Sequence, residues 1–305
     1  MKNKIIAVAG PTASGKTKLA IEIAKRFSGE VISCDSMQIY RGLNIGTAKP
    51  TADEMCGIPH HMIDIVNPEQ RYSVADFVRD ARTAVDDCLR RGKLPVIAGG
   101  TGLYMDSVLL NISFDEVVQD MDYRKKLQDY ADKFGAEALH TRLREKDSEA
   151  ADKIHPNNVR RVIRALEVCH TTGKTFTQVN NESRREPLYN AKIFGIDTDR
   201  EVLYNRIDRR VDIMLEDGLL DEVKRFYDAG LDRSTTAMQA IGYKEIYDFL
   251  DRKCSLEDAV EKIKMESRRY AKRQLTWFRR NEMIDWVKID NLDEIFEKCN
   301  DFLAK

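Results

Sequence analysis

Eight residues near the N-terminus have the types and spacing of a phosphate-binding loop. They follow the apolar run 5–9, precede a helical pattern and read Gly10, Pro11, Thr12, Ala13, Ser14, Gly15, Lys16 and Thr17. In this pattern, glycines let backbone N–H groups surround a phosphate oxygen, the lysine adds a positive charge and the threonine hydroxyl holds Mg²⁺. The sequence therefore predicts a P-loop, with Thr17 as a magnesium ligand.

Asp35 is a second candidate for chemistry. It follows the β-rich run 30–34. Ligands of open α/β sheets bind at the carboxyl ends of the strands, so Asp35 is expected to face the crevice that holds the P-loop. The alternative is that Asp35 only caps a turn, and the residues alone favour neither interpretation. The long irregular segment 37–50 that follows is typical of a functional loop.

A second glycine-rich turn follows the apolar run 94–98. It contains Gly99, Gly100, Thr101 and Gly102. Thr101 supplies the one polar side chain of this turn. Such glycines indicate close approach to a ligand or a tight strand-to-helix turn, and packing alone is the alternative.

Helices and strands alternate along most of the chain, which predicts an α/β fold with a parallel sheet flanked by helices. From about Ser113 to Pro187 the β-rich runs disappear and charged helical patterns take over. We therefore expect an all-helical domain (residues 114–187) inserted into a P-loop NTPase-like core (residues 1–113 and 188–305).

Two basic segments are candidate nucleic-acid surfaces. Arg160, Arg161 and Arg164 lie on one predicted helix of the insert, and the run 268–280 has six basic residues, no acidic residue and three aromatics. Basic residues interleaved with aromatics indicate RNA binding, but a solvated amphipathic helix gives the same pattern.

Composition places limits on the class of protein. The chain has 305 residues, 42% of them hydrophobic, with a net charge of −1. No signal-peptide pattern or membrane-length apolar run occurs, so we expect a cytoplasmic protein. Six cysteines are scattered without a C-x-x-C pair, and His60-His61 has no third ligand at metal spacing. We therefore expect structural or surface histidines, reduced thiols and no zinc site.

Several motifs in order along the whole chain resemble those of the bacterial tRNA dimethylallyltransferases, also called tRNA isopentenyltransferases. Besides the P-loop they are Asp35-Ser36, Tyr40-Arg41-Gly42, Ile45-Gly46-Thr47-Ala48-Lys49-Pro50, Gly99 to Tyr104, Asn158 to Arg161, Arg164 to Glu167, Arg210-Val211-Asp212, Ile241 to Glu245 and Ala271 to Trp277. The resemblance implies transfer of a dimethylallyl group from dimethylallyl diphosphate to N6 of adenosine 37 in tRNAs that read codons beginning with U. It implies as partners the diphosphate and the anticodon stem-loop of tRNA, with no membrane; we also expect a monomer.

The resemblance also assigns roles to individual residues. Asp35, Thr101 and Arg210 would be catalytic: Asp35 takes the amine proton, Thr101 bonds near the flipped adenine and Arg210 contacts the diphosphate. The P-loop and Thr17-bound Mg²⁺ would hold the diphosphate. The residues expected to contact tRNA are Asp35, Ser36, Met37, Gln38, Thr101, Tyr123, Arg124, Val159, Arg160, Arg161, Val162, Ile163, Arg164, Lys272 and Arg273.

Two other classes of protein share parts of this pattern. An ATP-dependent small-molecule kinase would use the insert as a lid with phosphate-clamping arginines. The lack of a second magnesium-binding Asp at a strand end disfavours it. An RNA-binding P-loop protein without catalysis would explain the basic helix but leave Asp35 beside the phosphate loop without a role.

Overall fold

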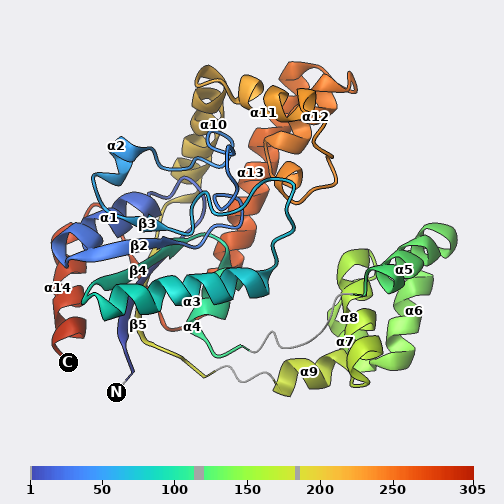
Figure 1. The fold of residues 1–305 in the computed structure, drawn as a ribbon, viewed down its shortest axis with the longest axis horizontal. Helices are drawn as coiled ribbons and strands as arrows, with labels where there is room; N and C mark the ends of the chain where they lie inside the picture. The colour runs from blue at the N-terminus through green and yellow to red at the C-terminus, as the bar shows by residue number, and fades with distance from the viewer. Residues whose placement is uncertain (1, 113–119, 183–185) are drawn as a thin grey trace. The chain divides into compact units, whose positions relative to one another are not determined.

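The chain divides into two compact units in the computed structural model, which describes residues 2–112, 120–182 and 186–305. The core unit comprises Met1–Leu109 and Leu188–Lys305, and the helical unit comprises Leu110–Pro187 (Figure 1). The boundary expected between residues 113 and 114 lies outside the described residues.

The core unit is built on a parallel sheet. Its six described strands follow the order β3-β2-β4-β1-β5-β6, and every neighbouring pair is parallel. They are β1 (Lys4–Ala9), β2 (Gly29–Ser33), β3 (His60–His61), β4 (Leu94–Gly99), β5 (Asn190–Ile196) and β6 (Ile284–Val287). Ala9 pairs with both Gly99 and Gly195, so β1, β4 and β5 end at the same level. The predicted α/β fold with a parallel sheet is confirmed. The sequence did not predict the two-residue strand β3.

Helices connect and cover these strands. In the described part of the core unit they are α1 (Lys16–Arg26), α2 (Ala52–Met55), α3 (Val74–Arg90), α4 (Gly102–Leu109), α10 (Arg200–Glu216), α11 (Leu219–Asp228), the 3₁₀ helix η1 (Ala237–Gln239), α12 (Tyr243–Leu250), α13 (Leu256–Phe278) and α14 (Leu292–Ala304). Capping boxes at Ser73 and Ser255 begin α3 and α13. The sequence pattern predicts one long helix over residues 256–281, but α13 ends at Phe278. No helix among the described residues combines the length and the apolar content that a membrane crossing requires.

Alternation along the strands assigns the two faces of the sheet. Val31 belongs to the apolar cluster that includes residues of α1 and α14. The side chain of its neighbour Glu30 instead contacts Cys88 of α3. Because successive strand residues point to opposite faces, α3 covers the face opposite α1 and α14. The carboxyl ends of β1 and β2 then lead directly into the P-loop and Asp35.

The helical unit has a core of its own. Its described helices are α5 (Met121–Phe134), α6 (Ala136–Lys146), α7 (Ser148–Lys153), α8 (Val159–Thr172) and α9 (Phe176–Glu182). Leu127, Leu139, Leu143 and Val162 pack in its apolar cluster, with Val162 fully buried. The sequence pattern predicts helices over residues 123–134, 136–143 and 159–168, which correspond to α5, α6 and α8, but it does not predict the shorter α7 and α9.

Candidate active site

The P-loop leaves β1 and ends at the first turn of α1. Gly15 is the N-cap of α1 with φ = 91°, and Ala13 also has a positive φ of 62°. Glycine adopts a positive φ without strain, so Gly15 suits the turn into α1, whereas Ala13 has a conformation that residues other than glycine rarely adopt. The Nζ atom of Lys16 donates a hydrogen bond to the carbonyl of Pro11 at 3.3 Å and so crosses the loop. This is the arrangement in which backbone N–H groups and the start of a helix receive an anion.

Lys16 and Arg210 supply positive charge to the wall of one cavity. Burial lowers the pKa of Lys16 to about 8, with Asp35 opposing this shift and Arg210 adding to it. Burial also lowers the pKa of Arg210, whose guanidinium donates to the carbonyl of Ala48 at 3.5 Å. Two desolvated cations on the wall of one cavity are stabilised by a bound anion.

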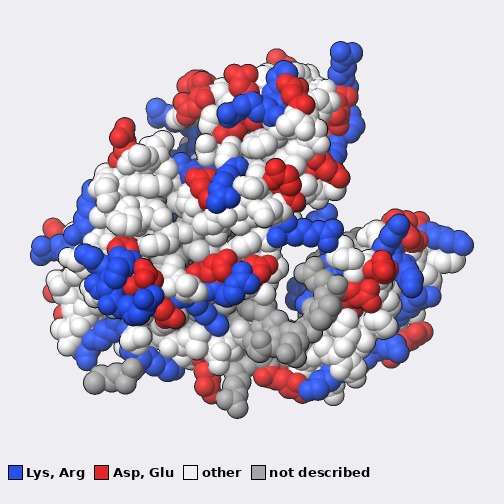
Figure 2. Space-filling view, in the orientation of Figure 1, with Lys and Arg blue, Asp and Glu red and all other residues white. Residues whose placement is uncertain are grey.

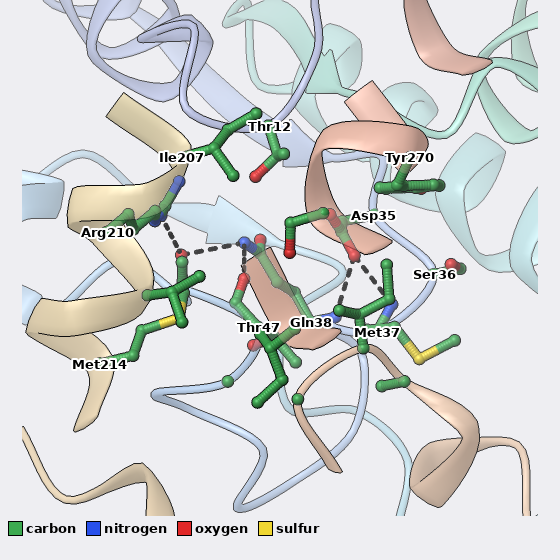
Figure 3. Close-up of a pocket in the computed structure, with 18 of the residues that line it drawn as sticks. Thr12, Asp35, Ser36, Met37, Gln38, Thr47, Ile207, Arg210, Met214 and Tyr270 are labelled. Carbon is green, nitrogen blue, oxygen red and sulfur yellow. Dashed lines mark hydrogen bonds between the residues drawn. The ribbon is translucent and has the colours of Figure 1, made fainter. Parts of the chain in front are cut away.

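The cavity has a volume of about 340 Å³ and two kinds of wall. Thr12, Lys16, Thr17, Asp35 and Arg210 line its polar part (Figure 3). The apolar part is lined by Ile207, Val211, Met214, Leu219, Ile241 and Ile263. Such a cavity accommodates a molecule that joins a strongly anionic group to a short hydrocarbon chain.

Asp35 combines both of the roles that its sequence position suggested. Its Oδ1 atom accepts hydrogen bonds from the N–H groups of Met37 at 2.9 Å and Gln38 at 3.4 Å, which caps the turn after β2. It also lines the cavity (Figure 3), and its charge raises the pKa of Lys16, which lines the same cavity. No hydrogen bond to Oδ2 occurs within the described residues. The turn therefore fixes one carboxylate oxygen and leaves the other available for a ligand.

Thr101 lies one residue behind the cavity wall. Its Oγ1 atom accepts a hydrogen bond from the N–H of Ser36 at 3.4 Å, and Ser36 itself lines the cavity. Tyr270 of α13 stands at the same wall; burial, followed by the charge of Asp35, raises its pKa to about 12. Thr101 can therefore position the segment that carries Asp35.

The glycines beside Thr101 pack tightly against the protein. A Cβ atom on Gly99 would lie 2.1 Å from the carbonyl oxygen of Cys34, and one on Gly102 would lie 2.2 Å from the ring of Trp277. One on Gly100 would lie 2.2 Å from Nε2 of Gln274. Packing geometry, one of the two explanations that the sequence left open, thus accounts for all three glycines.

Gln274 joins the two glycine-rich turns, a role that no local pattern in the sequence predicts. Its Oε1 atom accepts from the N–H of Thr12 at 2.9 Å, and its Nε2 atom donates to the carbonyl of Gly100 at 2.9 Å. The side chain is almost completely buried. The signal available in the sequence was its place within the motif 271–277.

Glu222 is a second residue that sequence reasoning missed. Its buried carboxylate accepts hydrogen bonds from the N–H groups of Asn44, Ile45 and Gly46, at 2.9–3.1 Å, and from the hydroxyl of Tyr243. It thereby holds the irregular loop 37–50 against α11. Gln38, which belongs to the same loop, donates hydrogen bonds to the carbonyls of Thr47 and Ala48.

The basic residues of α13 fall into two groups. Arg268 binds Asp208, and Arg269 binds Glu266. Lys272 and Arg273 are exposed, have no ion-pair partner within the described residues and line a surface hollow with Trp277. Trp277 is 40% exposed, whereas Phe278 is buried in the core. Basic and acidic side chains intermingle on the face of the core unit seen in Figure 2.

The candidate RNA-binding residues of the helical unit differ in exposure. Arg160 and Arg161 are exposed on α8, and Val159 is half-buried. Val162 and Ile163, at 0% and 7% exposure, belong to the apolar core of the helical unit, and their contact with tRNA stays a prediction. Tyr123 stacks on His170, with ring centroids 4.1 Å apart.

Arg124 and Arg164 both bind Glu167. Arg124 donates to both carboxylate oxygens of Glu167, at 2.7 and 2.8 Å, and Arg164 donates to one of them at 2.5 Å. Glu167 is completely buried. These two arginines therefore neutralise a buried carboxylate, which weakens the expectation that they are free for phosphate.

Comparison with known proteins identifies the family. The family model described as "IPP transferase" matches residues 38–281, and the one described as "Isopentenyl transferase" matches residues 3–67. A tRNA dimethylallyltransferase of Halalkalibacterium halodurans is 50% identical over 294 residues, which cover 96% of this chain and 93% of the relative. One of Bacillus subtilis is 52% identical over 285 residues, covering 93% and 90%.

Solved structures agree with this assignment. The full-length tRNA isopentenylpyrophosphate transferase of Bacillus halodurans matches with a TM-score of 0.75 and 47% identity, covering 99% of this chain and 97% of the other. A eukaryotic dimethylallyltransferase acting on tRNA matches with a TM-score of 0.85 and 32% identity, covering 99% and 80%. By these matches over nearly the whole chain, this chain belongs to the IPP transferase family of tRNA dimethylallyltransferases.

Proposed function

We propose that this protein transfers the dimethylallyl group of dimethylallyl diphosphate to N6 of adenosine 37 in tRNAs that read codons beginning with U. A bond forms between N6 and C1 of the dimethylallyl group, which is its CH₂ carbon. The bond from C1 to the diphosphate oxygen breaks. One amine proton leaves, and diphosphate is the second product. The observation that carries the proposal is the cavity in which a cationic end, an apolar wall and the Asp35 carboxylate meet.

Lys16 and Arg210 stabilise the departing diphosphate. Negative charge grows on the leaving oxygen as the carbon–oxygen bond breaks, and fixed cations aimed at this charge lower the barrier. The apolar wall, with Met214 and Ile241, holds the hydrocarbon and keeps water from the reacting carbon.

Asp35 accepts the proton of the adenine amine. Its Oδ1 is held by the N–H groups of Met37 and Gln38, so Oδ2 is the oxygen that receives the proton. Thr101 acts through Ser36 to position this turn.

The donor set at the P-loop fits a magnesium ion. The hydroxyl of Thr17 lines the same cavity as Lys16 and is a hard oxygen ligand of the kind that Mg²⁺ prefers. Bound there with the diphosphate, Mg²⁺ would neutralise part of the leaving group's charge.

The anticodon stem-loop is recognised by both units. We assign phosphate contacts to Arg160 and Arg161 of the helical unit, residues 110–187, and to Lys272 and Arg273 of the core unit, because these cations are exposed. Ser36, Met37 and Gln38 lie at the cavity where a flipped adenine would enter. The protein would act as a monomer in the cytoplasm.

Incubation with dimethylallyl diphosphate, Mg²⁺ and unmodified tRNA, followed by mass analysis of the tRNA nucleosides, tests the proposal. We expect N6-dimethylallyladenosine at position 37, formed without ATP and in much lower yield with chelator. A matched reaction contains labelled ATP in place of the prenyl donor. Transfer of labelled phosphate, with no modified adenosine in the first reaction, would favour a kinase instead.

A further inference from the structure

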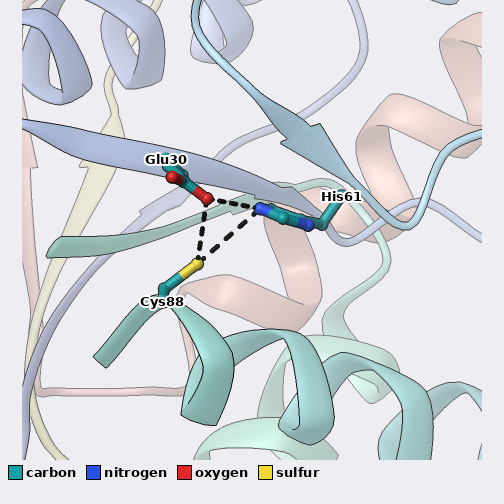
Figure 4. Close-up of side chains that lie close together, drawn as sticks. All are labelled: Glu30, His61 and Cys88. Atoms are coloured by element: carbon teal, nitrogen blue, oxygen red, sulfur yellow. Dashed lines mark hydrogen bonds and ion pairs between the residues drawn. The ribbon is translucent and has the colours of Figure 1, made fainter. Parts of the chain in front are cut away.

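Glu30, His61 and Cys88 form a cluster of potential metal ligands that come from three different elements. Glu30 lies near the start of β2, His61 on β3 and Cys88 near the end of α3 (Figure 4). Nε2 of His61 lies 2.7 Å from Oε2 of Glu30, and Sγ of Cys88 lies 3.4 Å from Oε2 and 3.7 Å from Nε2. One carboxylate oxygen, one ring nitrogen and one sulfur therefore point at a common centre.

The cluster is separate from the active site. Glu30 is at the amino-terminal part of β2, whereas Asp35 follows the carboxyl end of the same strand. Glu30 and Cys88 are buried, and the His61 side chain is 28% exposed, which leaves a route to solvent. The expectation that His61 has no third ligand rested on spacing in the sequence alone, and the fold brings in two partners from positions 30 and 88.

We propose that Glu30, His61 and Cys88 bind a divalent transition metal of the Zn²⁺ type. Zinc binds thiolate sulfur at about 2.3 Å and imidazole nitrogen or carboxylate oxygen at about 2.0–2.2 Å, so its ligands in a tetrahedron lie about 3.3–3.7 Å apart. The two separations that involve sulfur already match. The Glu30–His61 pair must open by about 0.6 Å from its 2.7 Å hydrogen bond to admit the ion.

The ligand set selects the class of metal. A thiolate and an imidazole favour zinc and similar borderline-soft ions over Mg²⁺ or Ca²⁺, which take oxygen ligands. Three protein ligands leave a fourth position, which water fills from the exposed side of His61. The ion would join the two-residue edge strand β3 to β2 and α3.

Arg91 is the competitor for this site. Its guanidinium binds both oxygens of Glu30 and also Oδ2 of Asp87 at 2.9 Å. Its hydrogen bonds, with those of His61 and Cys88, lower the pKa of Glu30 to about 2, so the carboxylate is charged. Arg91 is 42% exposed and can turn toward Asp87 when a metal takes Glu30.

Two of the three ligands carry negative charge when the metal is bound. Burial and the nearby Glu30 raise the pKa of Cys88 to about 12, so without metal this side chain is a neutral thiol. Metal binding must expel the thiol proton to solvent. The charges of Glu30 and the Cys88 thiolate then neutralise the dication, and Arg91 keeps its ion pair with Asp87, which also binds Arg90.

Cobalt titration of the full-length protein, after chelator treatment and in reducing buffer, tests the proposal. We expect a saturable near-ultraviolet sulfur-to-cobalt charge-transfer band at one-to-one stoichiometry, removed by an excess of Zn²⁺. The band should be lost in Cys88→Ser and weakened in His61→Asn. It should persist in Cys299→Ser, which changes another buried cysteine, and in Cys56→Ser, which changes an exposed one.

Two further results would decide against the site. A wild-type protein without the band, or a band that survives in both Cys88→Ser and His61→Asn, would overturn the proposal. His61 is partly exposed, so its variant keeps the test valid even if Cys88→Ser fails to fold, which circular dichroism would show. Arg91→Gln should bind Co²⁺ more tightly, since the competitor for Glu30 is gone; unchanged or weaker binding would contradict the exchange on which the site depends.

Discussion

In the core unit, Lys16 and Arg210 face a cavity and have no ion-pair partner within the described residues, whereas in the helical unit Arg124 and Arg164 share the buried Glu167. Basic side chains thus remain available to a ligand in the core unit, whereas in the helical unit they form a structural ion pair. Cations without partners in a desolvated cavity cost stability that a bound anion restores. Cations on a buried carboxylate stabilise the fold and contribute little to binding.

Of the changes that distinguish the two units, substitution of Asp35 should have the largest effect. Asp35→Asn keeps an oxygen that can accept from Met37 and Gln38 but cannot take up the amine proton. The single-turnover rate with saturating tRNA should fall about 10²-fold to 10⁴-fold, with little change in tRNA affinity. A rate equal to that of the wild type would reduce Asp35 to the turn cap that its hydrogen bonds also describe.

Glu167→Gln should produce the opposite result, a loss of stability localised to the helical unit. The change leaves Arg124 and Arg164 without their charge partner. Breaking a fully buried pair costs about 3–5 kcal/mol, and since these arginines are 30% and 38% exposed we expect about 2–3 kcal/mol. Hydrogen exchange of residues 120–182, with the core unit as internal control, measures this loss. Equal protection in wild type and variant would contradict it.

The same carboxylate makes the helical unit sensitive to acid. Burial alone would raise the pKa of Glu167, but hydrogen bonds from Arg124 and Arg164 lower it below its ordinary value of 4.5. A lowered folded-state pKa contributes stability above pH 4.5, which is lost as the pH falls through the folded-state value. Glu167→Gln should therefore flatten the pH dependence of unfolding below about pH 4.5. A variant with an unchanged acid profile would show that other carboxylates dominate.

Gln274 should matter for catalysis because it joins the P-loop to the second glycine-rich turn and lines the same cavity. Gln274→Met keeps the length of the side chain but leaves the N–H of Thr12 and the carbonyl of Gly100 without a partner. Each lost buried hydrogen bond costs about 1–3 kcal/mol. Part of this cost lowers the stability of the fold, and part disturbs the geometry of the P-loop. We expect a rate about 10-fold to 100-fold lower at saturating substrates, with partial rescue in Gln274→Glu through the Thr12 bond alone. Equal losses in both variants would indicate a purely structural role.

The smallest effects are expected on the RNA-facing surfaces. Lys272→Ala with Arg273→Ala, and separately Arg160→Ala with Arg161→Ala, should each reduce the dependence of tRNA affinity on salt by roughly one log–log unit per lost phosphate contact. Arg268→Ala is the matched control, because Asp208 already neutralises that side chain. A control that changes the slope as much as the exposed pairs would mean that pairing in the free protein does not predict RNA contact.

Local sequence was sufficient for the features whose residues are contiguous. The P-loop, the strand before it and the helix after it occupy residues 4–26, so glycine conformation and apolar periodicity specify them together. The same holds for Asp35 at the end of β2 and for α8 and α13, whose apolar spacing is regular. The short elements β3, α7 and α9 carry too few residues for a period to emerge.

Tertiary structure alone decided which of these residues have partners. Gln274 lies 262 residues from Thr12 and 174 from Gly100, and Glu222 lies 177 from the N–H of Ile45. No spacing rule operates over such separations, because the contact depends on how the whole sheet and its helices pack. For the same reason the sequence showed Arg124 only as a cation, because its partner Glu167 lies 43 residues away. Arg164 and Glu167 are three apart on α8, a spacing that favours an ion pair locally, and the fold adds the burial of Glu167 and its contact with Arg124.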